Sequence, residues 1–283
     1  MVKLSSLGSI VYGTAWKKEH TARLVIDAFK AGFRSVDTAG QPKHYREDLV
    51  GEALVQLYDE GIVKREDIWI QTKFTPLSGH DLTRPIPYDK VAPIPDRIAQ
   101  SFASSQKNLG TEVIDSYLLH SPLPTRAETL EAWRVLAQMR REGKVRMIGI
   151  SNIYDVGVLQ ALHEGSGEKC DIVQNRWYEG NHWSQEVLQY CRQHNIIFQS
   201  FWTLTGSPSL LAHPATAAIS RSLGCTREQV IYKLAQSVGI IPLAGSSNNQ
   251  HMHDGLGVAK LDISNDDVVP RLRELQKLVA GDS

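Results

Sequence analysis

Residues 33–57 read FRSVDTAGQPKHYREDLVGEALVQL, a stretch that predicts one strand followed by one helix. The first five residues form a short β-rich run that ends in an acid, Asp37. The last part places Leu49, Ala53 and Leu57 at helical spacing, which is typical of an amphipathic helix. The polar loop between them contains Tyr45. Two questions follow: how often this unit repeats, and whether the aspartate and the tyrosine face the same spot.

Strand and helix patterns alternate in this way along almost the whole chain. Several strand candidates are nearly continuous apolar runs, as expected for parallel strands covered on both faces. Eight strands without a linker or a change in composition predict one closed (β/α)8 TIM barrel, a single domain over residues 1–283. The rival is a doubly wound open sheet, which usually has a G-x-G-x-x-G turn after its first strand, and YGTAWKKEH (12–20) lacks it. The strand candidates are residues 9–13, 33–37, 67–74, 113–120, 145–151, 171–177, 196–202 and 239–245.

Helix starts are predicted where a capping residue is followed three positions later by an acid or a glutamine. The three pairs are Thr125 with Glu128, Thr226 with Gln229, and Ser264 with Asp267.

The composition is that of a globular protein that handles small molecules. Hydrophobic residues make up 42% of the 283 residues, enough for a sizeable core. The 31 basic and 31 acidic residues balance, so we expect neither nucleic acid nor a membrane surface as a partner. Three scattered cysteines are too few for a disulfide framework or a zinc site. The start, MVKLSSLGSIVYG, has no signal-peptide or membrane pattern, so we expect a cytoplasmic monomer or weak homo-oligomer.

Polar residues stand at the ends of the predicted strands, where barrel enzymes build their sites. Asp37 ends the second strand, Lys73 lies near the end of the third and His120 ends the fourth. Tyr45 lies in the loop directly after Asp37. Further polar strand ends are Ser151, Asn152, Gln174 and Asn175.

Asp37, Lys73, Tyr45 and His120 together make a proton donor for a carbonyl group. A nearby lysine ammonium is expected to lower the pKa of the tyrosine, and an aspartate paired with the lysine keeps it charged and oriented. The histidine can orient a carbonyl oxygen or help to pass the proton. Because the group has neither a strong nucleophile nor metal ligands, the electron pair must come from a cofactor, and a nicotinamide is the natural hydride donor.

With these residues in place, the sequence resembles the aldo-keto reductase superfamily over almost its whole length and in the family's order. The resemblance implies an NAD(P)-dependent carbonyl reductase on a (β/α)8 barrel. The matching segments are GTAW (13–16), GFRSVDTA (32–39), Tyr45 with VGEAL (50–54), IQTKF (70–74), DSYLLHSP (115–122), GKVRMIGISN (143–152), VQNRWY (173–178), QSFW (199–202) and IPLAGSSN (241–248).

The resemblance also implies individual roles. Asp37, Tyr45, Lys73 and His120 fall on the catalytic tetrad, with Tyr45 as the general acid; Tyr45 and His120 also face the substrate, together with Trp16. Phe201 matches the aromatic residue that stacks on the nicotinamide ring, although the adjacent Trp202 is an alternative. The other implied cofactor-binding residues are Thr14, Ala15, Asp37, Ser151, Asn152, Asn175, Gly245, Ser246, Ser247, Asn248 and His251.

The sequence departs from the family at three places. The resemblance implies NADPH as the cofactor. The family's cations around the 2′-phosphate are replaced by Gly245 and His251, which weakens a phosphate clamp and makes NADH possible. The gap from Asp37 to Tyr45 is longer than usual and places His44 beside the tyrosine. The chain stops at LQKLVAGDS (275–283), so we expect this end and the long loop 75–95 to shape a pocket that is open or covered by a partner subunit.

Two other functions stay open. One is a nicotinamide-binding sensor subunit with only residual reductase activity. The other is a metal-dependent hydrolase, suggested by the H-x-H pair His251 and His253. We expect no metal, because such pairs belong at a strand end and this one lies in a helical region. The cluster Lys17, Lys18 and Glu19 is interpreted as a solvated helix face.

Overall fold

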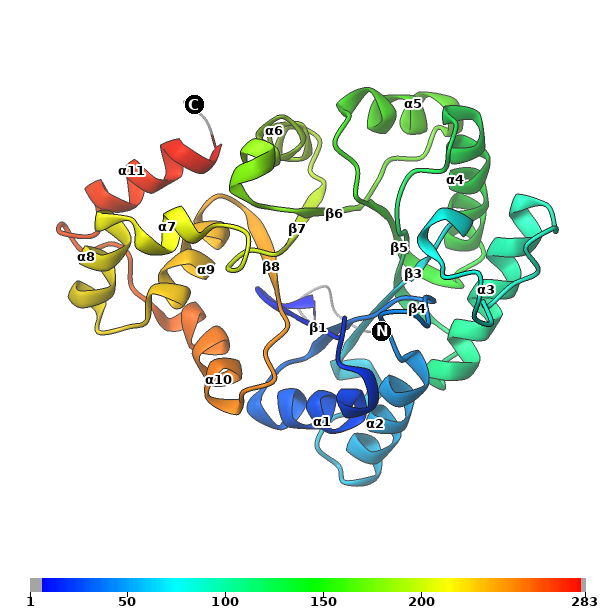
Figure 1. Ribbon diagram of the computed structural model, residues 1–283, viewed down its shortest axis with the longest axis horizontal. Helices are drawn as coiled ribbons and strands as arrows, with labels where there is room; N and C mark the ends of the chain where they lie inside the picture. Colours follow the sequence, from blue (N-terminus) through cyan, green and yellow to red (C-terminus); the bar gives the residue numbers. More distant parts are fainter. Residues whose placement is uncertain (1–6, 281–283) are drawn as a thin grey trace.

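Eight parallel strands close into a barrel in the order β1 to β8 in the computed structural model, which describes residues 7–280 (Figure 1). Each strand pairs with the next in the chain, and β8 pairs with β1. The (β/α)8 prediction is confirmed, and each predicted strand contains the observed one; the predicted domain bounds 1–283 extend beyond the described residues. The strands are β1 Val11–Gly13, β2 Ser35–Asp37, β3 Trp69–Phe74, β4 Ile114–Leu119, β5 Val145–Ser151, β6 Ile172–Arg176, β7 Ile197–Phe201 and β8 Ile240–Ala244.

Helices surround the barrel (Figure 1). The connection between β7 and β8 carries two extra helices, α7 and α8, and α11 packs on α8 after the barrel has closed. None of the described helices is long and apolar enough to cross a membrane. The helices are α1 Thr21–Ala31, α2 Glu47–Asp59, α3 Ile94–Leu109, α4 Arg126–Arg141, α5 Val156–Ser166, α6 Gln185–Gln193, α7 Pro208–Ala212, α8 Pro214–Leu223, α9 Arg227–Ser237, α10 Asn249–Gly257 and α11 Val269–Ala280.

Two of the three predicted capping boxes are present, at the starts of α4 and α9. The Thr125 hydroxyl accepts from the Glu128 N–H at 3.1 Å while the Glu128 carboxylate accepts from the Thr125 N–H at 3.0 Å. Thr226 and Gln229 make the same exchange.

The third predicted cap, Ser264 with Asp267, is wrong. The Ser264 N–H and hydroxyl both donate to Asp262, and the Asp267 N–H donates to the Asn265 side chain. These local turns satisfy the polar groups before the helix, so α11 begins later, at Val269.

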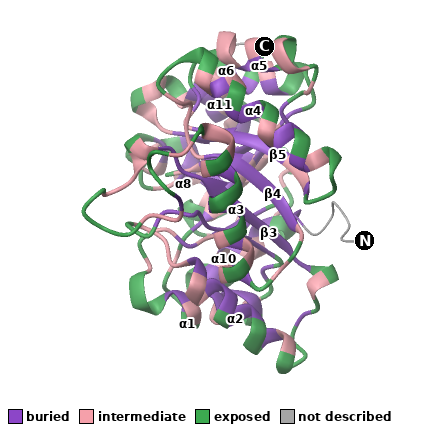
Figure 2. Cartoon of the chain, turned by 90° about the vertical axis from the view of Figure 1, so that its right-hand side faces the viewer, coloured by how far each residue is buried: buried purple, intermediate pink, exposed green. Residues whose placement is uncertain are grey.

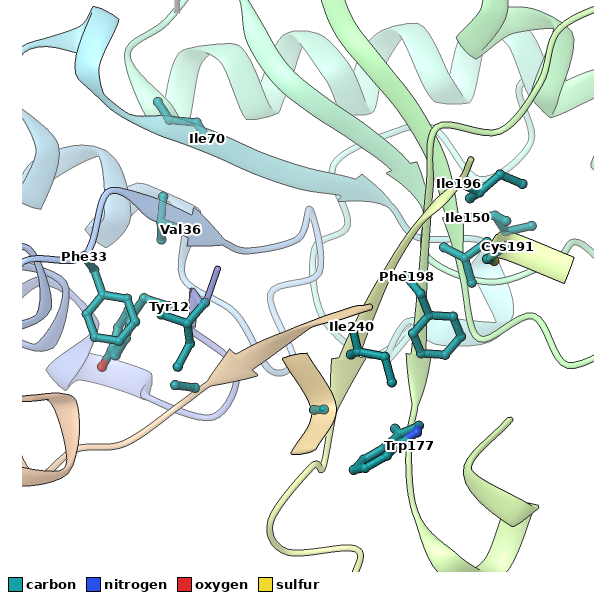
Figure 3. Close-up of a cluster of buried hydrophobic side chains, with 14 of the residues drawn as sticks. Tyr12, Phe33, Val36, Ile70, Ile150, Trp177, Cys191, Ile196, Phe198 and Ile240 are labelled. Carbon is teal, nitrogen blue, oxygen red and sulfur yellow. The ribbon is translucent and has the colours of Figure 1, made fainter. Parts of the chain in front are cut away.

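The hydrophobic core lies between the strands and the helices. In Figure 2 the strands are mostly purple, the colour of buried residues, whereas the outer faces of the helices are largely green, the colour of exposed residues. Side chains of alternate strand residues, such as Val36, Ile70 and Phe198, point outward into this layer (Figure 3). A second, smaller cluster of Leu7, Val11 and Trp69 fills the end of the barrel where the strands begin.

Farther along the strands than this apolar cluster, the inside of the barrel is polar. Gln71 from β3, Gln174 from β6 and Gln199 from β7 are buried and hydrogen-bond one another: Gln71 Nε2 and Gln174 Nε2 donate to Gln199 Oε1 at 2.7 and 2.9 Å. Gln71 and Gln174 also donate to Asp37 Oδ1 at 2.7 and 3.0 Å. This glutamine layer therefore fixes the Asp37 carboxylate at the mouth of the barrel.

Candidate active site

The floor of the candidate site is a buried ion pair. Lys73 Nζ lies 2.7 Å from each carboxylate oxygen of Asp37 and donates to the Thr38 carbonyl oxygen at 2.8 Å. The Lys73 side chain is 0% exposed and that of Asp37 is 2% exposed. Burial lowers the pKa of Lys73, and the Asp37 charge acts against this. Because lysine is rarely buried without a partner, the pair holds its charge through this geometry.

Tyr45 and His120 lie over this pair. The Tyr45 ring centroid is 5.4 Å from Lys73 Nζ and 5.8 Å from the centroid of the His120 ring. His120 Nδ1 is 2.7 Å from the Thr75 hydroxyl, which fixes the orientation of the imidazole. The structure thus brings together the four residues of the predicted tetrad, from β2, the loop after it, β3 and the end of β4.

The pKa of Tyr45 is raised, first by burial and second by the Asp37 charge. The sequence prediction that Lys73 lowers this pKa is therefore wrong. Burial disfavours a phenolate, and the Asp37 carboxylate, 2.7 Å from Lys73 Nζ, offsets the charge of the ammonium. Burial and the Lys73 charge hold the pKa of His120 well below its usual range. At neutral pH the site accordingly has the protonated phenol of Tyr45 and the neutral imidazole of His120 above the Asp37–Lys73 ion pair.

A cavity of about 830 Å³ opens above the tetrad. This volume suits a cofactor or a small-molecule ligand. Gly13, Leu243, Thr203 and Tyr232 are among its walls. Of the predicted site residues, the cavity lining includes Ala15, Trp16, Asp37, Tyr45, His120, Ser151, Asn152, Phe201, Gly245, Ser246 and His251.

The walls hold backbone conformations that non-glycine residues seldom adopt. Trp16, Asn152 and Trp202 line the cavity with φ values of 64°, 54° and 61°. Such residues cost free energy and persist where the surrounding structure imposes them, most often at functional sites. The Trp16 ring also lies on the His44 ring, with centroids 3.7 Å apart, so the extra loop residues before Tyr45 form part of the wall.

Two predicted residues lie directly beneath the cavity and not in its lining. Lys73 is covered by Asp37 and Tyr45. Thr14 is buried, and its hydroxyl donates to the Asp37 carbonyl oxygen at 2.9 Å. Thr14 therefore joins the loop after β1 to the end of β2.

Asn175, predicted to bind the cofactor, points away from the cavity. Its Oδ1 accepts from the Ile153 N–H at 2.9 Å and its Nδ2 donates to the Ile153 carbonyl oxygen. Its neighbour Gln174 lines the cavity instead. Successive strand residues face opposite sides, so only the register of β6 decides which of the two enters the site.

The segment after β8 reaches the cavity only in part. Gly245 and Ser246 line it, whereas Ser247 is exposed and outside the lining. The Asn248 side chain caps α10 and accepts from the Gln250 N–H at 2.8 Å.

Several charged residues of the lining have no role in the sequence prediction. Lys17 lies in the loop before the first helix, donates to the Gly245 carbonyl oxygen in the loop after the neighbouring strand β8, and has a pKa lowered by burial. The interpretation as a solvated helix face is wrong for Lys17, which precedes the 3-10 helix Lys18–His20 and lines the cavity, whereas Lys18 and Glu19 are exposed. Glu228 from α9, Asp254 from α10 and Arg176 from the end of β6 also line the cavity.

The loop 75–95 does not line the cavity. Its start reaches the site through the Thr75 hydroxyl, and the Tyr88 hydroxyl donates to the Thr75 carbonyl oxygen at 2.7 Å. The loop therefore supports His120 from behind and does not shape the described pocket, contrary to expectation.

No three histidine, cysteine, aspartate or glutamate side chains gather in a possible metal site within residues 7–280. His251 lines the cavity from α10, and His253 is exposed.

Comparisons with known proteins agree with this architecture. A sequence model of the Aldo/keto reductase family matches residues 6–277. An aldo-keto reductase of Mycobacterium sp. (strain JLS) is 28% identical over 251 residues, covering 88% of this chain and 82% of that protein. An uncharacterized oxidoreductase of Schizosaccharomyces pombe is 27% identical over 249 residues, with 88% and 81% coverage. The crystal structure of a Bombyx mori aldo-keto reductase in complex with NADP has the same fold: TM-score 0.79, 20% identity, 97% of this chain and 90% of that chain covered.

Proposed function

Because the chain belongs to the Aldo/keto reductase family and is an NAD(P)-dependent oxidoreductase, we propose that it reduces an aldehyde or a ketone to an alcohol, reversibly, with Tyr45 as the proton donor. The observation that carries this proposal is the joint placement of Tyr45 and His120 over the Asp37–Lys73 pair at the base of the cavity.

Each residue of the tetrad has a distinct part in the proposed reaction. Tyr45 keeps its proton at neutral pH because its pKa is raised, and an alkoxide is a strong enough base to take that proton. Neutral His120 orients the carbonyl oxygen between itself and the phenol. Lys73 places a positive charge beneath the developing negative charge, and Asp37 fixes the lysine.

The cavity suits a nicotinamide cofactor. When bound, the reduced cofactor supplies the hydride. Ser151, Asn152 and Gln174 at the ends of β5 and β6 would hold the carboxamide, and Phe201 would cover one face of the ring. These polar side chains can hydrogen-bond a carboxamide. Asn152 Nδ2 donates to the His120 carbonyl oxygen at 2.8 Å, and its Oδ1, which has no donor among the described residues, can accept from the amide of the cofactor.

We take NADPH as the cofactor, because two related Bombyx mori structures contain NADPH or NADP. NADH is the second candidate, since Glu228 and Asp254 line the cavity where the chain has Gly245 and His251 in place of the family's cations. A carboxylate disfavours a 2′-phosphate and favours a ribose hydroxyl. Fluorescence titration decides: we expect tighter binding of NADPH, and an NADH affinity at least about tenfold higher would replace it.

Replacing Tyr45 with phenylalanine tests the proposed function directly. We expect Tyr45→Phe to lower kcat by about 10²- to 10⁴-fold, because general acid catalysis contributes that much, and to leave the Kd of the cofactor within about threefold. Single-turnover oxidation of bound NADPH by a panel of aldehydes measures this. Tyr58→Phe, on the outer helix α2, is the matched control and should keep normal turnover.

Unchanged turnover in Tyr45→Phe would refute the role of this phenol. The alternative, a nicotinamide-binding sensor subunit, gains if the wild-type protein binds the cofactor tightly and no aldehyde or ketone oxidises it.

A further inference from the structure

Arg176 is a cation in the cavity wall without a partner. It is the last residue of β6, and its Nε–H is inaccessible to solvent and donates to no acceptor within the described residues. Arg176 is half-buried and its guanidinium forms no ion pair with any carboxylate in residues 7–280, whereas the fully buried Lys73 is paired with Asp37. A shielded N–H donor such as this Nε–H is costly unless an acceptor satisfies it.

Aromatic side chains hold this guanidinium in place. Its central carbon lies 3.8 Å from the centroid of the Trp202 ring, and 5.8 Å from the centroids of Phe201 and Tyr178. Stacking on a ring face leaves the in-plane N–H groups of an arginine free, and these are the groups that bind an oxyanion in a bidentate manner. The aromatic cradle therefore orients the donors without using them.

The remaining charges in the lining do not neutralise Arg176. Asp37 is bound by Lys73, and Lys17 donates to the Gly245 carbonyl oxygen. The two other acids of the lining, Glu228 and Asp254, come from α9 and α10, on elements that follow β7 and β8. The wall formed by β6 and β7 thus carries an unbalanced positive charge.

Strand geometry places this charge within reach of the tetrad. Arg176 is two residues after Gln174 on β6, so the two side chains face the same side and their Cα atoms are about 7 Å apart. Gln174 Nε2 is 3.0 Å from Asp37 Oδ1, in the layer of the ion pair. Arg176 accordingly lies one layer farther out on β6, in the lining of the same cavity as Tyr45 and His120.

We propose that Arg176 is an oxyanion-binding residue of the cavity. It binds a carboxylate carried by the carbonyl substrate or the diphosphate of the dinucleotide, and Trp202 holds it ready for this. The identity of the ligand rests on the proposed function. The experiments below distinguish a failure of the anion site from a failure of that function.

A matched pair of aldehydes tests the substrate source. In Arg176→Gln we expect KM for 4-carboxybenzaldehyde to rise about 10- to 100-fold and KM for 4-methylbenzaldehyde to change by less than about twofold, the size of a lost charge-assisted bidentate contact. Arg176→Lys keeps the charge and loses the two parallel N–H donors, so its KM for 4-carboxybenzaldehyde should fall between those of the wild type and Arg176→Gln. Arg221→Gln removes an exposed charge on α8 and should change neither KM.

The cofactor source predicts a different pattern. If the anion is the diphosphate, Arg176→Gln weakens NADPH binding about 10-fold or more in a fluorescence titration and raises KM for both aldehydes alike. Either pattern supports the proposal. If Arg176→Gln, folded by circular dichroism, keeps the wild-type KM values and the wild-type Kd for NADPH, the arginine is only a packing residue and the proposal is overturned.

A binding measurement keeps the proposal separate from the reductase function. Titration with benzoate and with inorganic phosphate should give a saturable change in tryptophan fluorescence, because Trp202 touches the guanidinium. The midpoint should rise about tenfold or more in Arg176→Gln. A protein that reduces no aldehyde yet shows this difference retains the anion site while the proposed function fails; no saturable change for either anion, together with unaltered kinetics, overturns the site.

Discussion

Two buried acids at opposite ends of the barrel strands, Asp37 and Asp115, have the same kind of partner and different surroundings. Asp37 ends β2 and binds Lys73, and both side chains are almost inaccessible. Asp115 lies near the start of β4, and its two carboxylate oxygens bind Arg65 at 2.7 Å and Arg146 at 2.8 Å. Both arginines are about one-third exposed, at 27% and 32%.

The difference shows that a buried ion pair is not by itself a sign of catalysis. Asp115 also accepts from the Ile70 N–H at 2.9 Å, and it joins β3, β4 and β5 outside the lining of the cavity over the tetrad. Asp37 and Lys73 lie under a cavity with a phenol and an imidazole beside them. At one end of the strands the charges hold the barrel together, and at the other we propose that they serve the reaction, as the usual division of such barrels suggests.

The largest expected effect comes from breaking the pair at the cavity. Lys73→Met leaves the Asp37 carboxylate buried without its cation, so we expect the free energy of unfolding to fall by about 3–5 kcal/mol and kcat to fall by at least about 100-fold. Urea unfolding and single-turnover kinetics measure the two effects.

The double variant Asp37→Asn with Lys73→Met separates these effects. Without either charge it should regain much of the lost stability and none of the lost activity. Recovery of turnover in the double variant would contradict a catalytic role for the pair.

A smaller effect, on stability alone, is expected at the other pair. Asp115→Asn keeps the shape and turns an amide N–H₂ toward one arginine, and the exposed parts of Arg65 and Arg146 stay hydrated. We expect the free energy of unfolding to fall by about 2–3 kcal/mol and kcat to stay within about twofold. A marked loss of kcat in a protein that remains folded at the assay temperature would break the division between the two ends.

The smallest effect concerns the pH dependence of stability through His120. Its pKa is held well below 6.5 in the folded protein, so below about pH 6.5 the unfolded chain binds a proton that the folded chain does not. Stability should therefore be lost as pH falls below that value, by at most about 1.4 kcal/mol per pH unit from this residue.

His120→Gln should flatten this dependence when urea unfolding is compared at about pH 7.5 and about pH 5.5. The pKa values of His44 and His80 are lowered by burial as well, so part of the slope should persist. An unchanged slope in His120→Gln would show that its imidazole is not desolvated.

The architecture and most of the candidate site could be predicted from the sequence. Alternating apolar strands and helices identify the eight strands, because burial on both faces leaves a pattern that needs no knowledge of contacts. Asp37, Lys73 and His120 follow from their places at strand ends, since parallel strands of a barrel all end at one mouth.

The residues that depended on tertiary structure share a physical cause. The choice between Gln174 and Asn175 follows from the register of β6, and the sequence letters alone do not fix which of two adjacent side chains faces inward. Lys17 lines the cavity in the loop where Trp16 has a φ of 64°, and no sequence pattern predicts this backbone conformation for a tryptophan. The pKa of Tyr45 depends on how much water the fold removes and on the distance from Asp37 to Lys73. Local periodicity therefore determined the barrel and the mouth, whereas packing across distant strands decided the protonation states and the unpaired charge on Arg176.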